Sequence, residues 1–365
     1  MSRAQQGHRK LGALLVLASV SALLLVPAAQ ATYDPIGSGT TKLNLDKGFL
    51  ALLKKQGVKL TAKAPAKRQG KTLIIPVSGG KSDPTTAKAE ILQGGTLVFQ
   101  KGNRKLPLRD IELKAKKTPF FAKVGGGQLK VASAKSIASK REGFGSSFTA
   151  NGLSLTQKLV TRLNKKLQTK DAFKEGQALG VIKSATQPQR VTILAQGQGT
   201  LVPDPAILAK FKSLFVSLNP ISPTQLSPGP VLSFPIAAGG QISPTASEGT
   251  LRLGGAIELL QLGAGQVFQQ EYWLDLGAKS ASAEVDIEPT PAFPGKLGRI
   301  GAFGLDMARA SVSSDPRART ITVANAPLTL DAQTAQTFND AFAAGKAVFA
   351  AGEAFGVVSF GAMGQ

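Results

Sequence analysis

The chain has no cysteine, and its only histidine is His8. Without thiols it forms no disulfide, no thiolate metal site and no cysteine nucleophile. Without histidine beyond residue 8, the rest of the chain has no Ser-His-Asp triad, no imidazole acid-base group and no histidine ligand for zinc. These absences predict a protein that is not an enzyme and that has no metal site.

The first 31 residues have the order of a secretory signal peptide. Basic residues precede an apolar run over residues 11–26, and residues 29–31, Ala-Gln-Ala, match a cleavage site. The run has about 16 residues, fewer than the roughly 20 that a membrane span needs. We therefore expect a secreted protein, associated with the cell envelope, whose mature chain begins at Thr32 and contains no transmembrane segment.

The rest of the chain contains an internal duplication, which consists of a first repeat (residues 32–188) and a second repeat (residues 189–365). In register, Leu43, Asp46, Leu50, Lys54, Gly79, Gly80, Gly94, Gly95, Leu153, Asn164 and Phe173 recur as Leu201, Asp204, Leu208, Lys212, Gly239, Gly240, Gly254, Gly255, Leu328, Asn339 and Phe349. A period of roughly 160 residues is too long for a solenoid and is typical of a duplicated domain.

The two repeats differ in charge. The first has 30 Lys and Arg against nine Asp and Glu, a net charge of +21, and the second has 11 against 13, a net charge of −2. Surface charge governs association more than it governs fold. The first repeat is therefore expected to meet an anionic partner.

Residues 157–168 show how the positive charges of the first repeat are arranged. An apolar stripe at helical spacing predicts an amphipathic helix, with Lys158, Arg162, Lys165 and Lys166 on its polar side. We expect these four residues to contact an anionic envelope polymer or lipid headgroups; a solvated helix surface is the alternative. Nucleic acid is not an expected partner, because the protein is exported and residues 42–185 contain no Tyr or Trp to stack on bases.

Helix and strand signals alternate in the same order in both repeats. Helices are expected over residues 46–56 and 156–168, and again over 204–217 and 331–344, with Asp46 and Asp204 as N-caps. Short apolar strands over residues 73–77 and 232–236 contain Pro76 and Pro235, which predicts positions at a sheet edge. The fold class is mainly β (α+β): two tandem β-sandwich-like domains, each with an N-terminal and a C-terminal helix.

One expected strand of the second repeat carries three carboxylates. Glu284, Asp286 and Glu288 alternate with Val285 and Ile287, so the three acids share one strand face. They could bind calcium, which takes oxygen ligands, or face the basic repeat. A solvated strand face is the favoured interpretation.

The plan of both repeats resembles the actinobacterial HtaA domain. The resemblance lies in the opening helices (LDKGFLALLKKQGVKL and DPAILAKFKSLFVSL), in the strands LIIPVSGG and LSFPIAAGG, and in the glycine pairs of EILQGGTLVF and LRLGGAIELL. It implies β-rich domains in an exported protein of haem uptake. In that family a tyrosine on the opening helix, with a histidine nearby, holds haem. Neither opening helix has a tyrosine here, so the haem site is not carried over.

Haem nevertheless stays a possible cofactor, with Tyr272 as its candidate ligand. The other tyrosine, Tyr33, lies outside the repeated stretch. Tyr272 shares a strand face with Leu274 and Leu276, which favours a core position. Three functions follow in order: an exported, non-enzymatic protein that binds an anionic envelope polymer or ligand; a carrier of haem or another small acidic ligand; and a structural surface protein.

Overall fold

The computed structural model describes residues 33–114, 120–263, 265–288 and 295–365. Within these ranges, no helix is both long and apolar enough to cross a membrane. The predicted signal peptide over residues 1–31 lies outside the described residues.

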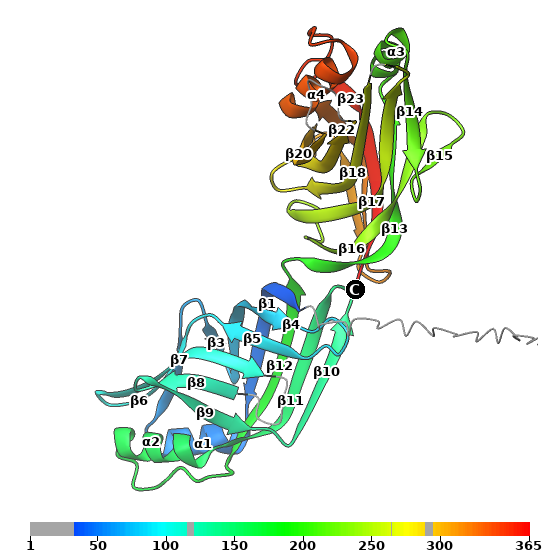
Figure 1. The fold of residues 1–365 in the computed structure, drawn as a ribbon. Helices are drawn as coiled ribbons and strands as arrows, with labels where there is room; N and C mark the ends of the chain where they lie inside the picture. The colour runs from blue at the N-terminus through cyan, green and yellow to red at the C-terminus, as the bar shows by residue number, and fades with distance from the viewer. Residues whose placement is uncertain (1–32, 115–119, 264, 289–294) are drawn as a thin grey trace, which may run out of the picture. The chain divides into compact units, whose positions relative to one another are not determined.

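The described chain forms two antiparallel sheets, one from each repeat (Figure 1). The first contains β1 (Asp34–Leu45), β2 (Lys59–Lys63), β3 (Lys67–Gln69), β4 (Thr72–Ser82), β5 (Ala89–Gln93), β6 (Thr96–Lys101), β7 (Arg104–Lys114), β8 (Phe120–Val124), β9 (Gly127–Ser133), β10 (Ser136–Glu142), β11 (Gly145–Leu155) and β12 (Ala178–Pro188). The second contains β13 (Val191–Pro203), β14 (Val216–Ile221), β15 (Gln225–Ser227), β16 (Val231–Ile242), β17 (Gly249–Gln261), β18 (Gly265–Asp275), β19 (Ser280–Ile287), β20 (Lys296–Leu305), β21 (Ser311–Asp315), β22 (Thr320–Leu330) and β23 (Ala354–Gly364). The mainly β class predicted from the sequence is confirmed.

Eight strands of each sheet pair in a closed ring. The first ring runs β1-β4-β5-β7-β8-β9-β11-β12 and returns to β1, and the second runs β13-β16-β17-β18-β19-β20-β22-β23 and returns to β13. The strand pairing therefore forms closed rings and not the predicted sandwich of two layers. The reason is that β7 pairs with β8 as well as with β5, and β16 pairs with both β13 and β17, so each sheet closes on itself around its own apolar core.

Pro76 and Pro235 belong to ring strands, which have neighbours on both sides, so the predicted positions at a sheet edge are wrong. On one side of β4, the ladder with β3 ends at Ile74 and the ladder with β5 begins at Val77. Pro76 occupies the gap between these two ladders, where its missing N–H is not needed. Pro235 lies in the matching gap of β16, between the ladders with β15 and β17.

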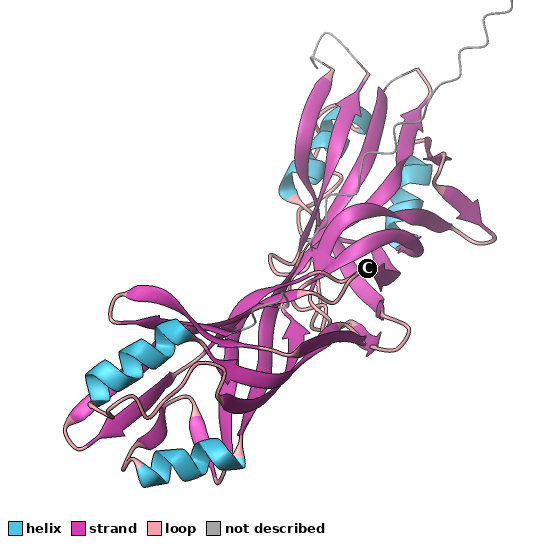
Figure 2. Ribbon diagram, turned by 90° about the horizontal axis from the view of Figure 1, so that it is seen from below, coloured by secondary structure: helices cyan, strands magenta, loops and turns pink. Residues whose placement is uncertain are grey.

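Each sheet carries two short helices, which lie together at one end of it (Figure 2). They are α1 (Lys47–Lys55) and α2 (Gln157–Leu167) in the first repeat, and α3 (Pro205–Ser213) and α4 (Ala332–Phe342) in the second. The carboxylate of Asp46 caps α1 by accepting from two backbone N–H groups, and Asp204 caps α3 in the same way from Ala206 N at 2.8 Å. α3 ends at Ser213, four residues earlier than the 204–217 pattern predicts.

An asparagine fixes the loop that follows the last helix of each repeat; Asn339 is buried and Asn164 is half-buried. In the second repeat, Asn339 Nδ2 donates to Phe349 O, and Asn339 Oδ1 accepts from Val348 N and Phe349 N, each at 2.8 Å. Asn164 holds Phe173 by the same type of bonds in the first repeat. The clamped phenylalanine packs on the opening helix, with ring centroids 5.5 Å apart for Phe211 and Phe349.

Candidate anion-binding site

α2 presents the four predicted cations to solvent. Leu159, Val160, Leu163 and Leu167 are buried against the sheet, which is the face that the apolar stripe predicts. Lys158, Arg162, Lys165 and Lys166 are exposed on the opposite side of the helix. Three of these four line one groove, and Lys158 does not.

The groove has a volume of about 940 Å³ and runs between α2 and the strands β7 and β8. From α2 it is lined by Arg162, Lys165 and Lys166. From the start of β7 it is lined by Arg104 and Lys105, which sequence reasoning did not single out. The sequence signal for these two residues is weak, because the segment Lys-Gly-Asn-Arg-Lys is equally typical of a solvated hairpin turn. Pairing in the fold brings two segments about 60 residues apart in sequence onto one surface.

The groove is positively charged and its cations are free of ion pairs. No Asp or Glu lines it, and none of its five Lys and Arg residues forms an ion pair with any described residue. Lys101 adds a sixth cation at the rim, where its Nζ donates to Gln168 O at 3.4 Å. Exposed cations close together repel one another and gain from an anion placed between them.

Helix electrostatics account for part of this charge. Lys165 and Lys166 lie in the last turn of α2, where a cation interacts favourably with the helix dipole by about 0.3–1 kcal/mol. That effect explains two cations without a ligand. It does not reach Arg104 and Lys105, which belong to a strand end on the other wall of the groove.

The second repeat builds the same helix without the cations. Aligned on Asn164 and Asn339, the positions of Lys158, Arg162, Lys165 and Lys166 are taken by Gln333, Thr337, Asp340 and Ala341. α4 nevertheless keeps the buried apolar face and the asparagine clamp. The fold therefore does not require the positive charges of α2.

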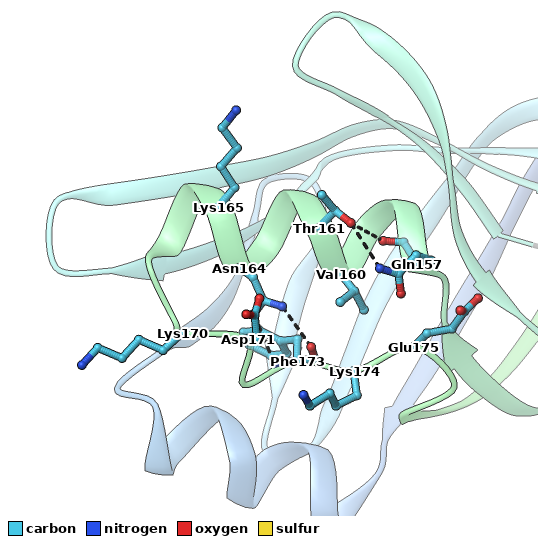
Figure 3. A pocket seen from close by; sticks show the side chains of 10 residues that line it. All are labelled: Gln157, Val160, Thr161, Asn164, Lys165, Lys170, Asp171, Phe173, Lys174 and Glu175. Atoms are coloured by element: carbon cyan, nitrogen blue, oxygen red, sulfur yellow. Dashed lines mark hydrogen bonds between the residues drawn. The ribbon is translucent and has the colours of Figure 1, made fainter.

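A second concavity shares Thr161 and Lys165 with the groove (Figure 3). Its volume is about 430 Å³, and Asn164 reaches across it to Phe173. Asp171 and Glu175 line it together with three lysines, so its charge is mixed. It suits an anion less well than the groove does.

A third concavity lies beside the opening helix of the first repeat. It has a volume of about 570 Å³ and combines the half-buried Leu50 and Ala62 with exposed Lys54, Lys59 and Lys67. An apolar floor with a cationic rim suits a small amphiphilic anion. Its lining contains no phenol, imidazole or thiol that could coordinate an iron ion.

Tyr272 lies in the core of the second ring and is 4% exposed. Its hydroxyl donates to Gln269 Oε1 at 3.3 Å, and Phe234 and Phe303 pack against its ring. Burial raises the pKa of its phenol well above 10.0, which disfavours the phenolate that binds ferric iron. The adjoining cavity of about 20 Å³ is too small for haem, so the geometry favours the core position.

The acidic strand face of β19 is already occupied. Arg299 Nε pairs with Glu284 at 3.2 Å, and Gln270 Nε2 donates to Asp286 at 3.4 Å. Among the described residues no group of three acidic or histidine side chains is arranged to hold a metal ion. Glu284 and Asp286 are half-buried and Glu288 is exposed, so the face is only in part the solvated strand face that the sequence favours.

No protein-family model matches the chain, and no curated protein matches it either. Two solved structures that do match are domains of HtaA from Corynebacterium glutamicum. The C-terminal domain is 14% identical with a TM-score of 0.36, and the N-terminal domain is 17% identical with a TM-score of 0.33. Each match covers 47% of this chain and 98% of the HtaA domain. The chain is therefore similar to both solved domains of HtaA, as the resemblance in its sequence predicted.

Proposed function

We propose that the protein is an exported binding protein whose first repeat attaches to an anionic polymer of the cell envelope through the groove beside α2. The observation that carries the proposal is the set of five exposed cations without ion pairs among the described residues on two facing walls. A groove with several cations on both walls suits a chain of repeated phosphates or carboxylates better than a single small anion. Each contact is weak, and many together give useful affinity.

The test measures the affinity of the purified chain from residue 32 onward for inorganic polyphosphate and for polyglutamate at low salt. Changing Arg162, Lys165 and Lys166 to Gln should weaken binding by about tenfold, because each exposed charge contact contributes up to about 1 kcal/mol. The matched control changes Lys42, Lys47 and Lys183 to Gln, which removes the same charge from exposed positions outside the groove. Equal losses in both variants would show a diffuse charge effect and contradict the groove.

A second candidate function is binding of a small amphiphilic anion at the concavity beside α1. The apolar floor and cationic rim favour it, and the resemblance to a haem-uptake family makes haem one ligand to test. Because the lining residues supply no iron ligand, haem itself does not fit as a coordinated group. A haemin titration of the purified protein should show no stoichiometric absorbance change of axial coordination. Such a change would overturn this view and restore haem as the function.

A further inference from the structure

Two large apolar side chains of the second repeat point into solvent. Phe215 and Leu262 are each 86% exposed, whereas the next most exposed large apolar residue in the described chain, Leu226, is 54% exposed. We call Phe215 and Leu262 the apolar tip. α3 and the start of β14 lie at the end of the second sheet opposite to the C-terminus (Figure 1). Burial of a Phe or Leu side chain normally stabilises a protein, so this exposure needs a cause.

The backbone holds the two side chains next to each other. Phe215 directly precedes β14, and Leu262 directly follows β17. Val216 pairs with Gln261 in the ladder between these strands. Gln261 Nε2 also donates to Leu214 O at 2.7 Å, which ties the two turns together. Strand pairing and this hydrogen bond therefore fix the position of the apolar tip on the sheet.

Phe215 occupies a backbone conformation that suits glycine. It follows the C-terminus of α3 with φ 56, and its N–H donates to Lys212 O at 3.1 Å. The first repeat has Gly57 at the matching position, with φ 62 and the same bond to Lys54 O. A side chain in this left-handed region is strained, and helix ends of this type normally use glycine. Phe215 thus strains the backbone, and because it is exposed it contributes no burial free energy in return.

Leu262 also replaces a glycine of the first repeat. Lys59 and Ser217 are matched positions, and their ladders pair them with Gln100 and Leu260, so Lys101 and Gln261 match as the residues that follow. The residue that follows is Gly102 in the first repeat and Leu262 in the second. The first repeat therefore makes the corresponding turns with glycine at both positions, so folding does not require the two apolar side chains of the tip.

We propose that the apolar tip inserts into the interface of a lipid bilayer. It projects from two turns, and a Cβ added at the neighbouring Gly263 would meet no atom within 4 Å, so open space surrounds it. The two turns, residues 213–217 and 261–263, contain serine and glutamine but no carboxylate, and Lys212 beside them is exposed. Apolar side chains bordered by hydroxyls and a cation match the layering of acyl chains beneath phosphate headgroups. This inference does not depend on the groove of the first repeat.

The experiment measures binding of the chain from residue 32 onward to phosphatidylcholine vesicles by co-sedimentation in 0.5 M NaCl. These vesicles carry no net charge, and salt screens the cations of the first repeat. The variants are Phe215→Gly, Leu262→Gly and the double change, with Leu92→Ser, which is 47% exposed in the first repeat, as the matched control. Each tip variant should bind about tenfold more weakly, while the control binds like the unaltered protein. Phe215→Gly should also raise the melting temperature or leave it unchanged, which separates lost binding from lost folding.

Two results would overturn the proposal. One is an unaltered protein that does not sediment with the vesicles, or a double variant that sediments as well as the unaltered protein. The other is a dimer in analytical ultracentrifugation that the double variant abolishes, which would make a second copy of the chain the occupant of the tip. Failure of polyphosphate binding would contradict the groove and leave this result untouched.

Discussion

Single residues decide where the two repeats agree and where they differ. Asn164 and Asn339 recur because each satisfies the backbone of a buried phenylalanine, Phe173 or Phe349, and a side chain without an amide would leave those groups unpaired. The recurrence was visible in the sequence, but its role was not, because the bonded loop residues follow about ten positions later. Phe215 shows the opposite case, in which a glycine position of the first repeat carries a bulky residue.

We expect Asn339→Ala to destabilise the protein by about 3 kcal/mol. The change leaves the N–H and the C=O of Phe349 without partners in a buried place, and each such group costs about 1–3 kcal/mol. Chemical denaturation should show a lower midpoint for the second repeat. Gln336→Ala on the exposed side of the same helix is the control and should change stability by less than about 1 kcal/mol. Equal stability of both variants would show that the clamp contributes little.

At the scale of elements, the helices were more predictable than the sheets. An N-cap such as Asp46 and an apolar stripe are local signals, and α2 covers 157–167 where the stripe spans 157–168. Ring closure depends on pairings between distant strands, for which the sequence has no local signal. The prediction that Pro76 lies at a sheet edge was wrong for a related reason. A gap between two ladders accepts proline as well as an edge does. Half of the groove was therefore predictable from α2, and the half formed by β7 was not.

Replacing the cations of α2 with the matching residues of α4 gives a sharper test of anion binding by α2. Changing Lys158, Arg162, Lys165 and Lys166 to the Gln, Thr, Asp and Ala of the second repeat should abolish measurable polyphosphate binding. Stability should change by no more than about 1–2 kcal/mol, because the buried face is kept and only helix-dipole contacts are lost. Circular dichroism and a melting curve check the fold. Retained binding would place the anion site elsewhere in the first repeat.

At the scale of the whole molecule, charge and apolar exposure are divided between the repeats. The first repeat holds a net charge of +21 and the second holds −2, together with the apolar tip. The sequence shows the division of charge directly. It does not show the tip, because an isolated Phe and an isolated Leu look like core residues until the turns that carry them are known.

This division predicts two binding activities with opposite responses to salt. Polyphosphate binding should weaken by about tenfold or more between 0.1 M and 1 M NaCl, because the screening length falls from about 10 Å to about 3 Å. Vesicle binding through the tip should persist or strengthen, since apolar transfer does not depend on charge. Isothermal titration at a series of salt concentrations measures both. A parallel decline of the two activities would mean that one electrostatic surface serves both ligands.

The closed rings also bear on how the chain avoids aggregation. A strand with an unpaired side can recruit another chain and start an aggregate. Each ring strand has a neighbour on both sides, although β20 pairs with β22 over three residues only, so the risk falls mainly on the flanking strands. Several of these strands are short, charged or interrupted by proline: β3 and β15 have three residues each, β10 ends on Lys140, Arg141 and Glu142, and β14 contains Pro220. Closed rings with such flanking strands therefore offer few free strand edges to a second chain, in a protein that has no disulfide.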